Sequence, residues 1–179
     1  MKIKIFLSLF LSAVLAKAQT VSEEVMKSLY EEVQSPYKYG MVVAPTDNDH
    51  KIDCPTIYRS GDRWYMTYVI YNGSEGLNGR GYTTWLAESA DLLHWNTLGC
   101  LLDYKDSGWD MNQRGGFPSL IDWKWNGSYE MSKYKNRYWM TYLGGEGTGY
   151  EGVRAPLFLG QAWTENSNTV AHEWSALDK

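Results

Sequence analysis

The stretch DCPTIY at residues 53–58, followed at once by GDRWYMTY at residues 61–68, decides the fold. It predicts a strand that begins at a carboxylate, a tight turn and a second strand, because β-branched and aromatic residues favour pleated, half-buried surfaces. The pattern returns as FPSLID at residues 117–122 and NRYWMTY at residues 136–142. The chain is therefore predicted to rest on a repeated strand pair, with Asp53 as the first candidate for a functional site.

Both copies of the pattern continue into further predicted strands, separated by polar or glycine-rich loops. The first copy is predicted to have strands at Ile52–Arg59, Arg63–Tyr71 and Tyr82–Ser89, and a fourth after Leu92-Leu93-His94-Trp95 that ends near Leu102. The second is predicted to have Phe117–Trp123, Arg137–Leu143 and Val153–Trp163, with His172-Glu173-Trp174 echoing His94-Trp95. Four strands per copy are typical of β-propeller blades, here blade one at about 52–102 and blade two at about 117–179. An insertion around Trp123–Lys133 separates the first two strands of the second copy.

The N-terminal residues predict an export signal and a short helix. Residues 1–18 have a basic start, an apolar run too short to span a bilayer, and the cleavage site Ala16-Lys17-Ala18. Val21–Gln34 predicts a helix with Ser22 as N-cap, which gives a helix and linker over residues 19–40. A short strand is predicted at Met41–Val43, within a propeller domain over residues 41–179.

Charge and cysteine content narrow the function further. Removal of residues 1–18 leaves 14 basic and 21 acidic residues, a net charge of −7, which disfavours binding to nucleic acid. Cys54 and Cys100 fall on strands that are not neighbours in a four-stranded sheet, so we expect two small buried thiols rather than a disulfide. Aromatic residues make up 15% of the chain, as strand filler or as sugar-stacking surfaces.

Three segments carry a resemblance to a known family: DCPT at 53–56, RWYMTY at 63–68 and LAESADLLHW at 86–95. Together they resemble the first blade of the five-bladed β-propeller glycosidases, glycoside hydrolase family 43 with families 32, 117 and 130 as relatives. The segment A-x-S-x-D-L-x-x-W is the most specific piece. The resemblance implies an all-β propeller of five blades. Since this chain would supply about two, after a short N-terminal helix, the remaining blades are expected from missing C-terminal sequence.

In the family pattern, an Asp directly before a Pro on the innermost strand of the first blade is the general base. Asp53 resembles it, with Cys54 between it and Pro55. One added residue turns a strand side chain to the other face, unless a bulge at the strand start corrects it. The position that matches Asp53 in the second copy is Gly116, so the family's second Asp is absent there. The third-blade acid lies outside this chain.

Strand directions predict which loops share one end of the sheets with Asp53. They are the segments Thr46–Lys51, Asn72–Gly81, Asp103–Arg114 and Gly144–Arg154. The insertion around Trp123–Lys133 falls at the opposite end, so we exclude its two tryptophans from the site.

The candidate catalytic residues are Asp53, as the base that activates water, and Glu146 or Glu151, as the acid that protonates the leaving oxygen. The alternatives are a strand-start carboxylate that caps local amides, and solvated loop glutamates. Trp109 is a candidate stacking platform, and Arg114 is either a ligand for the sugar or part of a surface ion pair. The candidate substrate-binding residues are Asp49, His50, Arg80, Trp109, Arg114 and Arg154. His94 is assigned to the structural Leu-His-Trp turn.

We therefore expect a periplasmic or secreted glycoside hydrolase that cleaves O-glycosyl bonds of plant or algal poly- or oligosaccharides. One alternative is a phosphorolytic enzyme like family 130, for which Arg80, Arg114 and Arg154 would supply the basic pocket. Another is a catalytically inactive carbohydrate-binding propeller. No cofactor or catalytic metal is expected, although the resemblance allows a structural calcium ion. The expected partner is the saccharide, with no nucleic acid and no membrane span.

Overall fold

The computed structural model describes residues 21–33, 40–45, 47–72, 79–150, 156–169 and 174–177. The chain divides into two units, Met1–Gly40 and Met41–Lys179, which are described separately. The predicted signal peptide lies outside the described residues. No helix in the described ranges is long and apolar enough to cross a membrane.

The first unit contains one α-helix, α2, at Glu23–Val33. The helix agrees with the prediction, because Ser22 caps it through a hydrogen bond from the Val25 amide to Ser22 Oγ at 3.3 Å. Glu23 and Glu24 stand in its first turn, where carboxylates interact favourably with the helix dipole.

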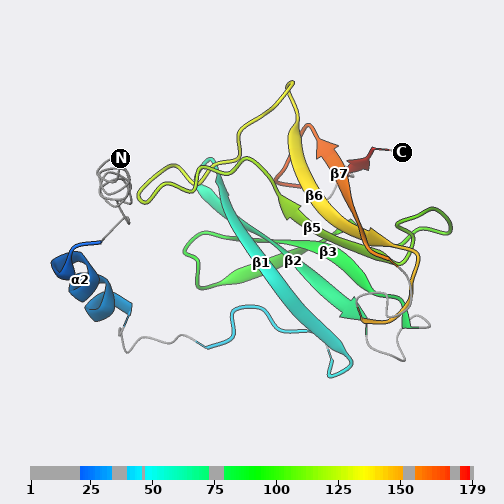
Figure 1. The fold of residues 1–179 in the computed structure, drawn as a ribbon, viewed down its shortest axis with the longest axis horizontal. Coiled ribbons are helices and arrows are strands. Elements are labelled where there is room, and N and C mark those ends of the chain that lie inside the picture. Colours follow the sequence, from blue (N-terminus) through cyan, green and yellow to red (C-terminus); the bar gives the residue numbers. More distant parts are fainter. Residues whose placement is uncertain are drawn as a thin grey trace, which may run out of the picture. The chain divides into compact units, whose positions relative to one another are not determined.

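The second unit is all-β, as predicted, and contains two four-stranded antiparallel sheets (Figure 1). In each sheet the strand order follows the chain, so every strand pairs with its sequence neighbour. This arrangement is consistent with part of a propeller. The first sheet is β1 His50–Ser60, β2 Arg63–Asn72, β3 Tyr82–Ser89 and β4 Trp95–Leu102; the second is β5 Gln113–Pro118, β6 Tyr138–Gly145, β7 Phe158–Thr164 and β8 Ser175–Ala176.

The two sheets share a hydrophobic core, to which β3 and β4 contribute Leu86 and Leu102, and β6 contributes Met140 and Tyr142, all almost fully buried. A hydrogen-bonded contact between β3 and β5 fixes the sheets against each other. Thr84 Oγ1 donates to the Arg114 carbonyl at 2.7 Å and accepts the Gly116 amide at 2.6 Å. The fold therefore presents the two sheets as one packed body.

Two predicted strands differ from the structure. Met41–Val43 lies in bent, irregular chain rather than in a strand. The first strand of the second copy ends at Pro118, so the predicted strand Phe117–Trp123 is wrong over most of its length. Glycines at 115 and 116 suggested a loop, but Gly116 has no room for a side chain, because a Cβ there would lie 2.3 Å from Met140 Sδ.

Strand pairing also corrects the predicted match between the two copies. Asp53 pairs with Val69 on β2, and the residue equivalent to Val69 on β6 is Leu143, which pairs with Gly115. The counterpart of Asp53 is therefore Gly115 rather than Gly116. The prediction missed by one residue because β1 contains an extra residue that β5 lacks.

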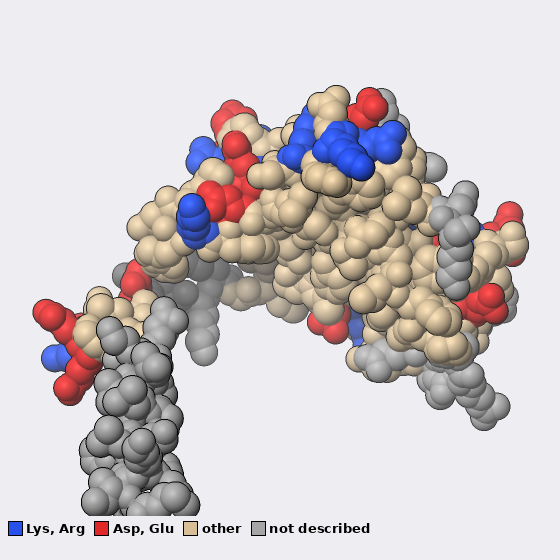
Figure 2. Space-filling view, turned by 45° about the horizontal axis from the view of Figure 1, so that its top comes forward, with Lys and Arg blue, Asp and Glu red and all other residues tan. Residues whose placement is uncertain are grey.

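The two cysteines are free, as expected, but only Cys100 is partly buried; Cys54 is exposed, contrary to the expectation. Burial raises the pKa of the Cys100 thiol to about 12, and a nearby Asp103 carboxylate adds to the effect. On the face of the second unit seen in Figure 2, charged side chains gather toward the rim around a broad uncharged area.

Candidate functional site

Asp53 stands at a β-bulge near the start of β1. The register shifts between Asp53 and Thr56, so that Cys54 and Pro55 together oppose one residue of β2. Cys54 takes up the extra length with a left-handed φ of 51°. The bulge restores the alternation, so Asp53 faces the same side of the sheet as Thr56.

The Asp53 carboxylate is held in place by its own backbone, since Oδ1 accepts the Cys54 amide at 2.7 Å. This is the capping contact that the alternative interpretation expected, and it also fixes the orientation of the carboxylate. The side chain is exposed and borders a hollow of about 110 Å³ between the two sheets. We call this the Asp53 hollow; it is lined by Asp53, Cys54, Val69, Tyr82, Gly115, Phe117, Leu143 and Tyr150.

Aromatic rings form part of the wall of the Asp53 hollow. Tyr150 stands edge-on to Tyr71, with ring centroids 5.4 Å apart, and packs against Tyr82 at 6.0 Å. Phe117 on β5 is 37% exposed and Tyr150 is 49% exposed. The hollow thus combines a carboxylate with exposed ring faces, which suit the C–H face of a sugar ring.

The loops predicted to share the Asp53 end of the sheets do meet there. The Gly81 amide donates to the Asn112 carbonyl at 2.9 Å, and the Asn112 amide donates to the Gly145 carbonyl at 3.0 Å. Glu146 follows directly after β6 and is exposed, and its carbonyl accepts the Asn112 Nδ2 at 2.6 Å. Glu146 therefore stands in the loop cluster beside the hollow.

Gln113 organises this loop cluster from a fully buried position at the start of β5. Its Nε2 donates to the carbonyls of Gly147, at 2.9 Å, and Gly149, at 2.8 Å. Its Oε1 accepts the Tyr82 amide at 3.2 Å. One side chain thereby ties the 146–150 loop, which ends in Tyr150, to the first sheet.

Arg80 is bound within the protein rather than presented to a ligand. Its Nε donates to Asn112 Oδ1 at 2.6 Å, and its Nη2 donates to the Met111 carbonyl at 2.7 Å and to the Lys105 carbonyl. The guanidinium also lies 4.4 Å from the centre of the Tyr104 ring. These contacts make Arg80 the organiser of the β4–β5 loop.

Arg114 is buried and forms an ion pair with Asp110, which is also buried; Nε lies 3.2 Å from Oδ2. Its Nη1 donates to the Asp103 carbonyl at 2.6 Å. The pair is buried rather than at the surface, and it faces away from the Asp53 hollow. Burial alone would raise the pKa of Asp110, but hydrogen bonds from Lys105 and Tyr142 and the Arg114 charge hold that pKa below its usual range.

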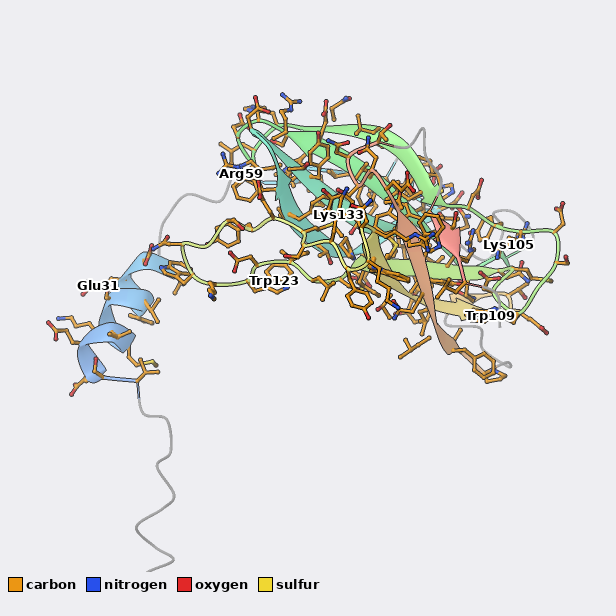
Figure 3. All side chains as sticks on the ribbon, turned by 90° about the horizontal axis from the view of Figure 1, so that it is seen from above. Glu31, Arg59, Lys105, Trp109, Trp123 and Lys133 are labelled. Atoms are coloured by element: carbon orange, nitrogen blue, oxygen red, sulfur yellow. The ribbon has the colours of Figure 1, made fainter. Side chains whose placement is uncertain are left out.

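Trp109 packs flat on the second sheet, stacked on Tyr142 with ring centroids 5.7 Å apart. A Cβ on Gly144 would lie 2.4 Å from the Trp109 ring, so the indole occupies space that this glycine leaves open. Figure 3 shows Trp109 near Lys105, at the same end of the unit. The ring thus packs against the sheet, and it does not line the Asp53 hollow.

Asp49 and His50 precede Asp53 but do not line the Asp53 hollow. Asp49 is exposed, and its amide donates to Asp47 Oδ1 at 2.9 Å. His50 Nδ1 lies 2.6 Å from the same oxygen. His50 borders a separate hollow of about 440 Å³ on the other face of the first sheet, beside Ile52.

The remaining predicted residues are placed as follows. Glu151 and Arg154 lie outside the described residues. His94 stays in its turn, with Nδ1 2.7 Å from Asp91 Oδ2, at the end of β3 away from Asp53. That hydrogen bond lowers the pKa of Asp91. In the described ranges, no group of three or more His, Cys, Asp or Glu could hold a metal ion.

Sequence reasoning missed Gln113, Phe117 and Tyr150. The start of β5 has the composition of a loop, which hides the inward position of Gln113. Tyr150 stands in a glycine-rich segment whose glutamates are the more obvious candidates. The signal that was available is the lone aromatic residue in an otherwise small and polar loop, GGEGTGY at residues 144–150.

Comparison with known proteins gave matches among solved structures only. No protein-family model matches the sequence, and no curated protein does. A structure named "Glycoside hydrolase" is 63% identical, with a TM-score of 0.79 over 89% of this chain and 46% of its own. Another, named as a complex of BT0996 and RGII, is 63% identical with a TM-score of 0.80 and the same coverage. The chain is thus a close homologue that spans about half the length of these two proteins.

Proposed function

We propose that this chain forms part of an exported glycoside hydrolase, similar to family 43, that cleaves O-glycosyl bonds of plant or algal poly- or oligosaccharides. The observation that carries the proposal is 63% identity over 89% of the chain to a protein named glycoside hydrolase. The second matched structure has RGII in its name, so RGII is the first substrate to test.

In the proposed mechanism, Asp53 is the general base that activates water. The bulge at Cys54 supports this role, because it turns Asp53 toward the Asp53 hollow. Glu146 or Glu151 protonates the leaving oxygen. A separation of ~6.5–9.5 Å between the carboxyl groups would give inversion, and ~5–5.5 Å would give retention with Asp53 as nucleophile.

Phe117 and Tyr150 are proposed to hold the sugar ring beside Asp53. Their exposed faces supply apolar contact, and the carboxylate supplies a fixed polar group, the usual combination in small-molecule sites. The hollow of about 110 Å³ is smaller than the ~300 Å³ at the lower end of such sites, so these residues form one side of the binding site.

The test uses a hybrid in which this chain replaces the matching part of the homologous glycoside hydrolase. The hybrid should release sugar from RGII, and Asp53→Asn should lower kcat by about a hundredfold or more, the usual contribution of a general base. Asp62→Asn, in the turn at the opposite end of β1, is the matched control and should retain activity. Full activity in Asp53→Asn would refute the assignment.

The same hybrid separates the two alternatives. The phosphorolytic alternative needs free cationic groups, but Arg80 and Arg114 are committed to protein partners. Addition of phosphate should therefore leave the product unchanged, with no sugar phosphate. Binding of the saccharide without any turnover would favour a carbohydrate-binding propeller instead.

A further inference from the structure

The insertion between β5 and β6 forms a well-anchored arm, residues 119–137, that the proposed activity does not use. The Arg59 amide, near the end of β1, donates to the Tyr129 carbonyl at 2.8 Å, and the Ser132 amide donates to the Leu120 carbonyl at 2.8 Å. Ile121 and Met131 face each other across the arm and are both buried. The arm is therefore fixed to the sheets at its base.

The tip of the arm is a braced turn. Asp122 Oδ2 accepts the Ser128 amide at 2.9 Å and the Ser128 hydroxyl at 3.1 Å, and the Gly127 amide donates to the Lys124 carbonyl at 2.7 Å. Within the described ranges, five of the seven non-glycine residues with positive φ belong to the arm: Leu120, Asn126, Tyr129, Lys135 and Asn136. Such backbone persists where the surrounding contacts determine it.

This braced turn displays two tryptophans to solvent. Trp123 is 64% exposed and Trp125 is 77% exposed, and Tyr134 further along the arm is also exposed. Figure 3 shows Trp123 on the arm, away from Trp109. Large rings held on a rigid loop lose little freedom on binding, so their display indicates a binding surface.

The charge of the arm differs in sign from that of the whole protein. The arm contains four basic residues and two acidic ones, whereas the full sequence carries a net charge of −4. The basic residues are Lys124, Lys133, Lys135 and Arg137. A cationic surface with exposed rings favours an anionic ligand that also offers apolar faces.

We propose that the arm binds an anionic polysaccharide, whose sugar rings stack on Trp123 and Trp125 while its carboxylates meet the basic residues. The choice of a glycan rests on the proposed function, and the sign of its charge rests on the arm alone. Arg59 lies six residues beyond Asp53 on β1, about 20 Å at ~3.3 Å per residue. The arm is thus a second site, which holds the polymer away from the Asp53 hollow.

The test is gel electrophoresis of the full chain in gels that contain polygalacturonate. The protein should be retarded, and Trp123→Ala with Trp125→Ala should lower the affinity at least about tenfold. Met41→Ala with Leu159→Ala removes similarly exposed apolar groups outside the arm and should leave retardation unchanged. Fully methyl-esterified polygalacturonate, which keeps the backbone but loses the charge, should bind at least about tenfold more weakly.

A charge reversal tests the electrostatic half of the proposal. Lys124→Glu should weaken binding, while Lys27→Glu in α2 makes the same change in net charge and should have no effect. Trp123→Phe with Trp125→Phe keeps the rings and should keep most of the affinity, which guards against a folding defect in the alanine variant. No retardation of the parent protein, equal binding by the alanine variant, or equal binding to the esterified polymer would each overturn the proposal. Self-association that the tryptophans mediate would also overturn it. None of these readouts depends on turnover, so the result stands apart from the test of the proposed function.

Discussion

Gly115 and Gly116 are neighbours on β5 that differ in the space around them. A Cβ on Gly116 would lie 2.3 Å from Met140 Sδ and 3.1 Å from Leu102 Cδ1, whereas one on Gly115 would meet Val69 at an ordinary 3.5 Å. Gly116→Ala should therefore lower the free energy of unfolding by about 2 kcal/mol, as overpacked cores do. Gly115→Ala should change it by less than ~0.5 kcal/mol. Urea denaturation measures both, and equal losses would contradict the packing.

The same pair separates stability from activity. Gly115 lines the Asp53 hollow, so an added methyl group there reduces the space for a sugar while the fold stays intact. Gly115→Ala in the hybrid enzyme should raise KM several-fold. An unchanged KM would mean that substrate does not enter the hollow.

Cys54 holds a backbone conformation that costs a non-glycine residue about 1–2 kcal/mol. Cys54→Gly should therefore leave the free energy of unfolding unchanged or raise it by up to ~1 kcal/mol, after the entropy cost of glycine. Cys54→Val should lower it by ~1–2 kcal/mol, because β-branching is worst at positive φ. Lys51→Val, at a regular position of the same strand, is the control and should be tolerated in urea melts. Tolerance of valine at both positions would argue against the bulge.

At the level of single residues, the sequence located Asp53 but not the condition of its placement. The motif contained one residue too many for a regular strand, and only a bulge could reconcile the two. Whether a strand bulges depends on its pairing with β2, which no local pattern specifies. Arg80, Arg114 and Trp109 were misassigned for a related reason. An arginine or tryptophan in a loop can meet a ligand or the protein itself, and the partners here, Asp110 and Tyr142 among them, are brought close only by the fold.

Among the elements, the 146–150 loop depends on Gln113. Gln113→Glu keeps the size and the acceptor but removes both donated hydrogen bonds, and it places a carboxylate against two carbonyls. The loop should loosen, with at least about tenfold faster hydrogen exchange at the Gly149 amide, which the Gly79 carbonyl accepts.

The matched control for this change is Gln161→Glu on β7. Gln161 is exposed and donates to Thr141 Oγ1 at 2.9 Å, so the same substitution there should leave exchange at Gly149 unaltered. Similar acceleration in both variants would show that charge, rather than the lost hydrogen bonds, loosens the loop.

The helix and β1 to β4 were predictable as elements because each shows a strong local signal: a capped apolar stripe, or alternating aromatic residues. The start of β5 was not. Its residues Gln113-Arg114-Gly115-Gly116 have little intrinsic preference for a strand, and they pair because β3 and β6 close over them. Tertiary contacts overrode local propensity at this point.

For the molecule as a whole, buried tyrosines predict loss of stability at high pH. Burial raises the pKa of Tyr104 to about 12, from about 10 in an unfolded chain, and its hydroxyl donates to the Gly81 carbonyl at 2.5 Å. The folded state thus resists ionisation. The stability is complete below about pH 10 and is lost as the pH rises from about 10 to 12.

Tyr104→Phe should make the free energy of unfolding depend less steeply on pH in that window, although it lowers stability at neutral pH by ~1 kcal/mol through the lost hydrogen bonds. Urea melts at pH 8, 10 and 11 measure this. Tyr134→Phe, at an exposed position, should keep the parent pH dependence. A parent protein with constant stability across the window would contradict the buried phenol.

The repeat made the architecture of two sheets predictable, yet alignment of the prolines displaced the correspondence between copies by one position. Gly115, not Gly116, is the counterpart of Asp53, and the extra residue of the bulge accounts for the difference. That residue has an evolutionary consequence. If Cys54 were deleted, Asp53 would pair with Tyr68 and point to the other face, while the strand beyond Thr56 kept its partners. A single codon gained or lost in one copy of a duplicated gene is thus enough to give or remove an inward carboxylate.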